Sequence, residues 1–318
     1  MGYDKEIIAK AFSVKEEECE KARAAYYAAL KKAKENSPRL VRIEQELSQI
    51  GAQILLLGLS GDQAGLKAAQ KNSEALASEK RGILQKAGLS EKPILCRKCQ
   101  DTGRCNNRLC TCITEIAKHL TLAQCEKFMP LSECGFDRFS LAYYPPECQK
   151  KMEKNLEFCR RYAEQFSPLS TNILMLGKSG LGKTFLSLAI TRKVIDAGYG
   201  VIYGSAQDLF RKAENEHFSF GGTSPELDRL LSCDLLVIDD LGTELKTAFN
   251  TSLLYNIVNT RLLQKRPTVI NTNLTFAELE ERYSARITSR FVGEYEMRSF
   301  VGTDIRQQKA MERLKKDS

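Results

Sequence analysis

The stretch GKSGLGKT, residues 177–184, decides the fold. It fits the pattern G-x-x-x-x-G-K-[ST], in which glycines let backbone N–H groups turn inward and surround phosphate oxygens. Lys183 supplies a positive charge for the β- and γ-phosphates, and the hydroxyl of Thr184 suits Mg²⁺. The loop therefore predicts a site for ATP and Mg²⁺. Its expected contacts are Gly177, Lys178, Ser179, Gly180, Leu181, Gly182, Lys183, Thr184 and Phe185.

The segments on both sides of this loop support the assignment. The apolar run NILML (172–176) leads into the loop, and an amphipathic stretch leads out of it and stops at Gly198. Three more apolar runs follow, separated by helical stretches: GVIYGS, DLLVIDD and PTVINTN. Strands that alternate with helices indicate a parallel sheet covered on both faces, so the predicted fold class is α/β.

Polar side chains follow two of these predicted strands. In LLVIDDLG (235–242), Asp239 is expected to hold Mg²⁺ through water and Asp240 to orient the attacking water. A strand that ends in two solvated aspartates is common by itself, and the upstream phosphate loop makes this one a candidate site. In INTN, either Asn271 or Asn273 is placed to reach the attacking water or the γ-phosphate, although strand-end asparagines are often turn formers.

Two arginine motifs follow. YSARITSRF puts Arg286 and Arg290 at positions i and i+4 of one helical face, and TDIRQQK contains Arg306. Solvated arginines are the simplest interpretation. The alternative is a trans-acting arginine that reaches a neighbouring subunit's γ-phosphate, with Arg306 as a sensor in its own site.

Together these motifs resemble the AAA+ ATPases of the DnaC/DnaI helicase-loader and IstB transposition-helper group, over about residues 135–318. The resemblance includes the lead-in FDRFSLAYY. It implies an AAA+ P-loop core in which Lys183 and Thr184 bind phosphate and Mg²⁺. It further implies the following roles: Asp239 and Asp240 as Walker B acids, Asn273 as sensor 1, Arg290 as arginine finger and Arg306 as sensor 2.

The sequence departs from the AAA+ pattern in two ways. The second acid is Asp240, where AAA+ proteins usually have glutamate, and its shorter reach predicts slow hydrolysis that suits a switch. The residues that follow the last strand are also too few for a full helical lid domain.

The stretch CRKCQDTGRCNNRLCTC (96–112) predicts a second site. Cys96 with Cys99 and Cys110 with Cys112 form two thiolate pairs that can close a tetrahedral S₄ site, which Zn²⁺ favours. An iron–sulfur centre and unmetallated thiols are the alternatives, and Cys105 is left over. The pattern resembles the zinc-binding N-terminal domain of DnaI-like loaders, which implies an adaptor that binds a partner protein.

Residues 1–92 are predicted to be helical throughout. After Ser37-Pro38, apolar residues alternate at spacings of three and four, and GLSGDQAG interrupts them before a weaker series. An antiparallel, coiled-coil-like hairpin fits, packed either on itself or on a partner. The two series are Leu40, Ile43, Leu47, Ile50, Ile54 and Leu57, then Leu66, Ala69, Ser73, Leu76, Lys80 and Ile83.

Composition sets limits on location and partners. The net charge of +8 allows a nucleic-acid partner without requiring one. The longest apolar run, ILLL (54–57), is far too short to span a membrane, and the N-terminus lacks a signal-type apolar core. Eleven cysteines, an odd number, argue against a disulfide framework and favour the cytoplasm.

These observations predict four segments: a helical partner-binding domain (1–92), a zinc module (93–115), a linker (116–145) and an AAA+ ATPase domain (146–318). The expected function is ATP-dependent loading of the hexameric replicative helicase, with contact to single-stranded DNA and self-association through the ATPase domain. The first alternative is an IstB-like transposition helper that acts on target DNA. The second is a zinc-dependent adaptor with a purely structural ATP site.

Overall fold

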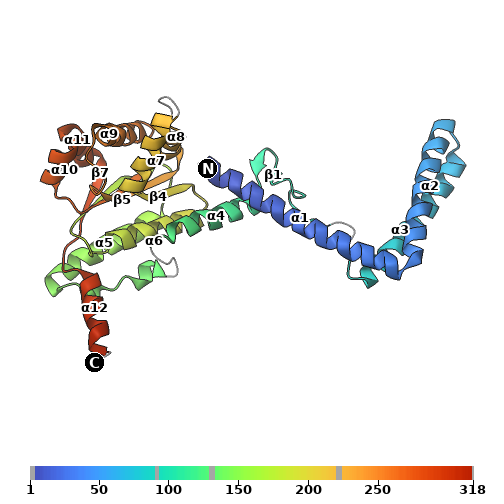
Figure 1. The fold of residues 1–318 in the computed structure, drawn as a ribbon, viewed down its shortest axis with the longest axis horizontal. Helices are drawn as coiled ribbons and strands as arrows, with labels where there is room; N and C mark the ends of the chain where they lie inside the picture. Colours follow the sequence, from blue (N-terminus) through green and yellow to red (C-terminus); the bar gives the residue numbers. More distant parts are fainter. Residues whose placement is uncertain (1–3, 90–92, 129–132, 220–223, 317–318) are drawn as a thin grey trace. The chain divides into compact units, whose positions relative to one another are not determined.

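The computed structural model describes residues 4–89, 93–128, 133–219 and 224–316. Its contacts divide the chain into two compact units. The sheet unit comprises Met1–Ala11 and Thr114–Ser318, and the helical unit comprises Phe12–Ile113. Figure 1 shows the helices and strands in chain order by colour.

The sheet unit is built on five parallel strands, which confirms the predicted α/β class. Their order in the sheet is β4-β5-β6-β3-β7, so the strand that leads into the phosphate loop lies between two strands that come later in the chain. The bounds are β3 (Asn172–Leu176), β4 (Val201–Ser205), β5 (Leu235–Leu241), β6 (Thr268–Thr272) and β7 (Tyr295–Ser299).

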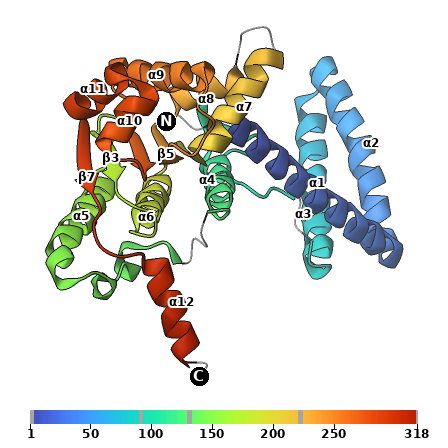
Figure 2. The same cartoon turned by 60° about the vertical axis from the view of Figure 1, so that its left-hand side comes forward.

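Helices cover both faces of this sheet, because alternate strand residues point to opposite faces. Ile173 of β3 packs in the cluster that contains α5 and α6, whereas its neighbour Leu174 packs in the cluster that contains α7 to α11. Figure 2 shows these two groups on either side of the strands. The bounds are α5 (Pro146–Glu164), α6 (Lys183–Asp196), α7 (Ala206–Ser219), α8 (Pro225–Ser232), α9 (Ala248–Leu263), α10 (Phe276–Tyr283) and α11 (Ala285–Glu294).

Residues 116–145, expected to be a linker, contain regular structure. They include most of α4 (Thr111–Cys125) and two short 3-10 helices, η2 (Phe136–Arg138) and η3 (Leu141–Tyr143). After β7, a single helix, α12 (Ile305–Lys316), follows in the part of the chain that the structure describes.

The helical unit contains a hairpin of α2 (Pro38–Ser60) and α3 (Gln63–Lys86), which lie side by side in Figures 1 and 2. The two helices meet along the predicted apolar series, where Ile43, Ile50 and Leu76 are buried. Gly61 adopts a left-handed conformation at the end of α2, and the carboxylate of Asp62 accepts a hydrogen bond from the Gly65 N–H at the start of α3. The GLSGDQAG segment therefore forms the turn.

The remaining elements of this unit are α1 (Lys5–Asn36), which begins in the sheet unit, and two short strands, β1 (Arg104–Cys105) and β2 (Arg108–Leu109). β1 and β2 pair antiparallel next to the cysteine cluster. Among the helices of the described residues, none is long and apolar enough to span a bilayer.

Candidate nucleotide site and cysteine cluster

The phosphate loop connects β3 to α6 through three glycines with positive φ. At Gly177 a Cβ would lie 2.6 Å from the carbonyl oxygen of Phe300, and at Gly180 it would lie 2.0 Å from Oδ1 of Asp304. A side chain at Gly177 would overlap the backbone of Phe300, and one at Gly180 would displace the carboxylate of Asp304. The glycines of the motif are thus required by close packing as well as by backbone conformation.

The ammonium group of Lys183 donates three hydrogen bonds. Its Nζ lies 2.5 Å from the carbonyl oxygen of Gly177, 2.8 Å from that of Lys178 and 2.7 Å from Oδ1 of Asn273. Burial lowers the pKa of Lys183 to about 8, against the opposing charges of Asp240 and Asp239. The group is therefore a concentrated, weakly hydrated positive charge at the base of the loop.

Asp239, at the end of β5, is buried and bound through both carboxylate oxygens. Oδ1 accepts hydrogen bonds from Nδ2 of Asn271 at 2.7 Å and from the hydroxyl of Thr184 at 3.2 Å. Oδ2 accepts one from the hydroxyl of Tyr203 at 2.8 Å. Burial raises the pKa of the Asp239 carboxyl. The Thr184 hydroxyl and the Asp239 carboxylate thus place two oxygen atoms side by side, and Mg²⁺ prefers oxygen ligands. These residues therefore fit the predicted ion.

Asp240 and Asn273 lie on the nucleotide side of the site. The Nδ2 of Asn273 donates to Oδ1 of Asp240 at 3.2 Å, while its Oδ1 accepts from Lys183. Asn271 instead lies fully buried behind Asp239. Sequence reasoning left the choice between the two asparagines open, and the structure gives them different surroundings.

A pocket opens over this constellation. Asp240, Asn273 and Arg306 line it, together with the loop from Ser179 to Phe185. Gly177 and Lys178 do not line this pocket, and their carbonyls bind Lys183 instead. The structure thus brings most of the predicted nucleotide residues together around one pocket.

Sequence reasoning missed two parts of the site. One wall of the pocket comes from the segment before α5, in which only a general resemblance had been noted: Arg138, Phe139, Ser140 and Tyr143. The other missed residue is Tyr203. Its position in β4 carries no local signal, because only the order of the strands places it beside Asp239.

Arg290 lies elsewhere. Its guanidinium donates to Oδ1 of Asn259 at 2.8 Å and to the hydroxyl of Tyr255 at 3.0 Å, and it lies 4.7 Å from the centre of the Tyr255 ring. Both partners belong to α9. Arg290 does not line the pocket of its own chain.

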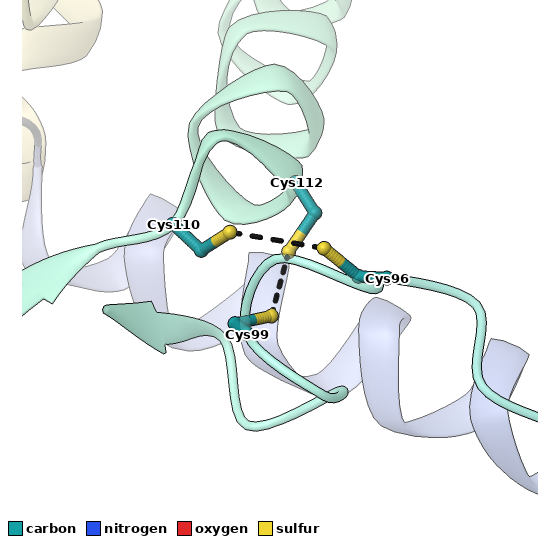
Figure 3. Close-up of side chains that lie close together, drawn as sticks. All are labelled: Cys96, Cys99, Cys110 and Cys112. Carbon is teal, nitrogen blue, oxygen red and sulfur yellow. Dashed lines mark hydrogen bonds between the residues drawn. The ribbon is translucent and has the colours of Figure 1, made fainter.

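The second predicted site lies in the helical unit. The sulfur atoms of Cys96, Cys99, Cys110 and Cys112 all lie within 4.8 Å of one another (Figure 3). The Sγ atoms of Cys96 and Cys110 are 3.8 Å apart, and those of Cys99 and Cys112 are 3.6 Å apart. Zinc–sulfur bonds of about 2.3 Å in a tetrahedron give sulfur separations of about 3.8 Å. The four thiols therefore fit Zn²⁺.

The backbone around the cluster supports thiolates. The Gly103 N–H donates to Sγ of Cys99 at 3.3 Å, and hydrogen bonding from the backbone at Cys112 lowers the pKa of Cys110 to about 6, whereas burial raises the pKa of Cys112. Cys105 is not one of the four, and its thiol donates to the carbonyl of Lys98 at 3.3 Å.

The loop that carries the first cysteine pair is fixed by Asp101. Its carboxylate accepts from the N–H groups of Leu95 at 3.0 Å and Cys96 at 2.7 Å, and it forms an ion pair with Lys15 at 3.2 Å. Both charged side chains of this pair are almost fully buried, so they hold the loop against α1 within the helical unit.

The sheet unit is similar to known proteins. Residues 149–291 match the family of IstB-like ATP binding proteins. The chain is 30% identical over 159 residues to the replicative helicase loader DnaC of Escherichia coli (strain K12), which covers 49% of this chain and 62% of that protein's length. It is 26% identical over 198 residues to the phage-like element PBSX protein XkdC of Bacillus subtilis (strain 168), covering 58% and 73%.

Among solved structures, a crystal structure of the DnaC helicase loader matches with a TM-score of 0.48 and 21% identity, over 54% of this chain and 99% of that one.

The family match spans β3, α6, β5 and β6, which are the elements that hold the phosphate loop, both aspartates and both asparagines. Residues 149–291 of this chain are therefore an IstB-like ATP-binding domain.

Proposed function

We propose that the protein is an ATP-dependent loader of the replicative DNA helicase. The observation that carries the proposal is the convergence of Lys183, Thr184, Asp240 and Asn273 around one pocket, with the buried Asp239 bonded to Thr184, in a chain related to DnaC over 159 residues. Because the aligned region covers 62% of DnaC, the activity and partners of that protein enter here as proposals.

In this proposal the site binds ATP and hydrolyses it slowly. The loop N–H groups and Lys183 bind the phosphates, and Thr184 and Asp239 hold Mg²⁺, which neutralises phosphate charge. Asp240 orients the attacking water, and Asn273 links it to Lys183 through its two amide atoms. The short side chain of Asp240 limits its reach toward that water, so hydrolysis acts as a timer that ends the interaction with the partner.

Self-association is the second part of the proposal. Arg290 is half-buried on α11 and is held in place by Tyr255 and Asn259, away from the pocket of its own chain. From this position it acts as an arginine finger on a neighbouring copy, while Arg306, which lines the pocket, senses nucleotide in its own chain. The helical unit with its zinc-stabilised cysteine cluster binds the helicase, and the ATPase domains contact single-stranded DNA. The protein acts in the cytoplasm.

The test is size-exclusion chromatography of the full chain mixed with the replicative helicase from the same organism, in the presence of ATP and Mg²⁺. Co-elution that is lost in Lys183→Ala supports the loader. The name of the matching family favours a second candidate, a transposition helper. That candidate predicts ATP-dependent binding to duplex DNA and separate elution of the helicase.

A further inference from the structure

The phenol of Tyr203 lies beside Asp239, on the side of the site proposed to hold Mg²⁺. Tyr203 lies in β4, next to β5, where Ser205 pairs with Asp239. Its hydroxyl reaches Oδ2 of Asp239 at 2.8 Å. An ionised carboxylate only accepts hydrogen bonds, so the Tyr203 hydroxyl is the donor.

The other carboxylate oxygen is fixed from different elements. Asn271 of β6 and Thr184 of α6 both donate to Oδ1 of Asp239. Ser187 connects these donors, because its hydroxyl accepts from Nδ2 of Asn271 at 2.8 Å, lies 3.3 Å from the Tyr203 hydroxyl and donates to the carbonyl of Thr184 at 3.1 Å. Because both oxygens of the Asp239 carboxylate accept hydrogen bonds, its rotation about the side-chain bonds is restrained.

The ring of Tyr203 is itself held in place. Phe128, just after α4, packs edge-on against it with ring centroids 4.8 Å apart, and both rings pack against the apolar cluster beneath α5 and α6. The hydroxyl therefore has a defined position without any help from solvent. Any hydrogen-bond acceptor would satisfy a tyrosine that serves only the stability of the fold. The acceptor of Tyr203 is the carboxylate to which the proposed mechanism assigns Mg²⁺ binding.

We infer that Tyr203 is a positioning residue that fixes the Asp239 carboxylate in the orientation that binds Mg²⁺. The inference rests on the proposed ATP site and goes beyond it, because it assigns metal affinity to a residue on a strand outside the phosphate loop and the acidic motif. Partners that orient a metal-binding group commonly change metal affinity or activity by about 10–100-fold when removed.

The test compares Tyr203→Phe with the wild-type full chain in equilibrium binding of a fluorescent ATP analogue, titrated with Mg²⁺. The inference predicts that the Mg²⁺ concentration at half-maximal effect rises roughly tenfold. Binding of the analogue without Mg²⁺ is unchanged, and turnover at saturating Mg²⁺ returns toward the wild-type value. The matched control is Tyr162→Phe, which also removes a tyrosine hydroxyl of the sheet unit, bonded at 2.9 Å to the carbonyl of Thr171.

Phe128→Leu gives a second variant that leaves the hydroxyl in place and removes only the ring that supports it. A smaller shift in the same direction is expected, and thermal unfolding of each variant shows that it is folded. Equal Mg²⁺ midpoints in wild type and in both folded variants overturn the inference. If the wild type itself shows no Mg²⁺-dependent binding of the analogue, the proposed ATP site has failed instead.

Discussion

At the scale of single residues, Lys183 couples nucleotide binding to pH. Its ammonium must be charged to bind phosphate, and burial lowers its pKa to about 8. Bound phosphates raise that pKa again. Above pH 8, where free Lys183 is mostly neutral, ATP binding therefore requires Lys183 to take up a proton. We expect the affinity for ATP to be roughly tenfold weaker at pH 9 than at pH 7. Calorimetric titration at both pH values measures this.

The control for this prediction is Lys183→Arg, because a guanidinium stays charged throughout this range. Its affinity, whatever its absolute value, should be the same at pH 7 and pH 9. A parallel loss in the arginine variant would assign the pH effect to another group.

Gly180 gives the second prediction at this scale. It has φ of +74°, and an added Cβ would overlap the carboxylate of Asp304, which caps α12. The left-handed backbone alone costs a larger residue roughly 1–2 kcal/mol. A loop that shifts to relieve this strain no longer surrounds the phosphates with its N–H groups, so we expect calorimetric titration to show roughly tenfold weaker ATP binding by Gly180→Ala. Gly293→Ala, at a helical glycine with no atom near the added Cβ, should leave binding unchanged.

At the scale of secondary-structure elements, the hairpin of α2 and α3 is stabilised by its apolar seam. Ile43 is fully buried there, whereas Leu59 near the end of α2 is 81% exposed. Ile43→Ala should therefore lower the free energy of unfolding of the helical unit by about 2–5 kcal/mol. Urea unfolding followed by circular dichroism measures it. Leu59→Ala should unfold at the wild-type urea concentration, and a comparable loss in both variants would contradict the assigned packing.

The elements also show what sequence alone predicts. The phosphate loop and the hairpin seam are encoded by local spacing, so Lys183 and Ile43 could be assigned from the sequence. The contacts of Asp239 with Tyr203 and Asn271 depend on the strand order β4-β5-β6, which local patterns do not contain. Likewise, Arg138 and Tyr143 line the pocket only because the chain before α5 returns to the phosphate loop.

At the scale of the whole molecule, the candidate zinc cluster and the candidate nucleotide site lie in different units. The four cysteines belong to the helical unit and the phosphate loop to the sheet unit. We expect one zinc ion per chain, retained in Cys105→Ser and lost in Cys110→Ser. ATP binding should survive in both variants. Metal analysis of the purified proteins and titration with ATP test the two statements, and zinc loss in Cys105→Ser would contradict the four-cysteine site.

Loading of the replicative helicase onto DNA is the activity proposed for this protein, and an unwinding assay measures it. The assay follows unwinding of a DNA fork coated with single-strand-binding protein by the replicative helicase, with the wild-type chain, with Lys183→Ala or with neither. We expect unwinding to require the wild-type chain with ATP, and we expect that Lys183→Ala does not replace it. Equal unwinding with and without the wild-type chain would show that this protein is not a helicase loader.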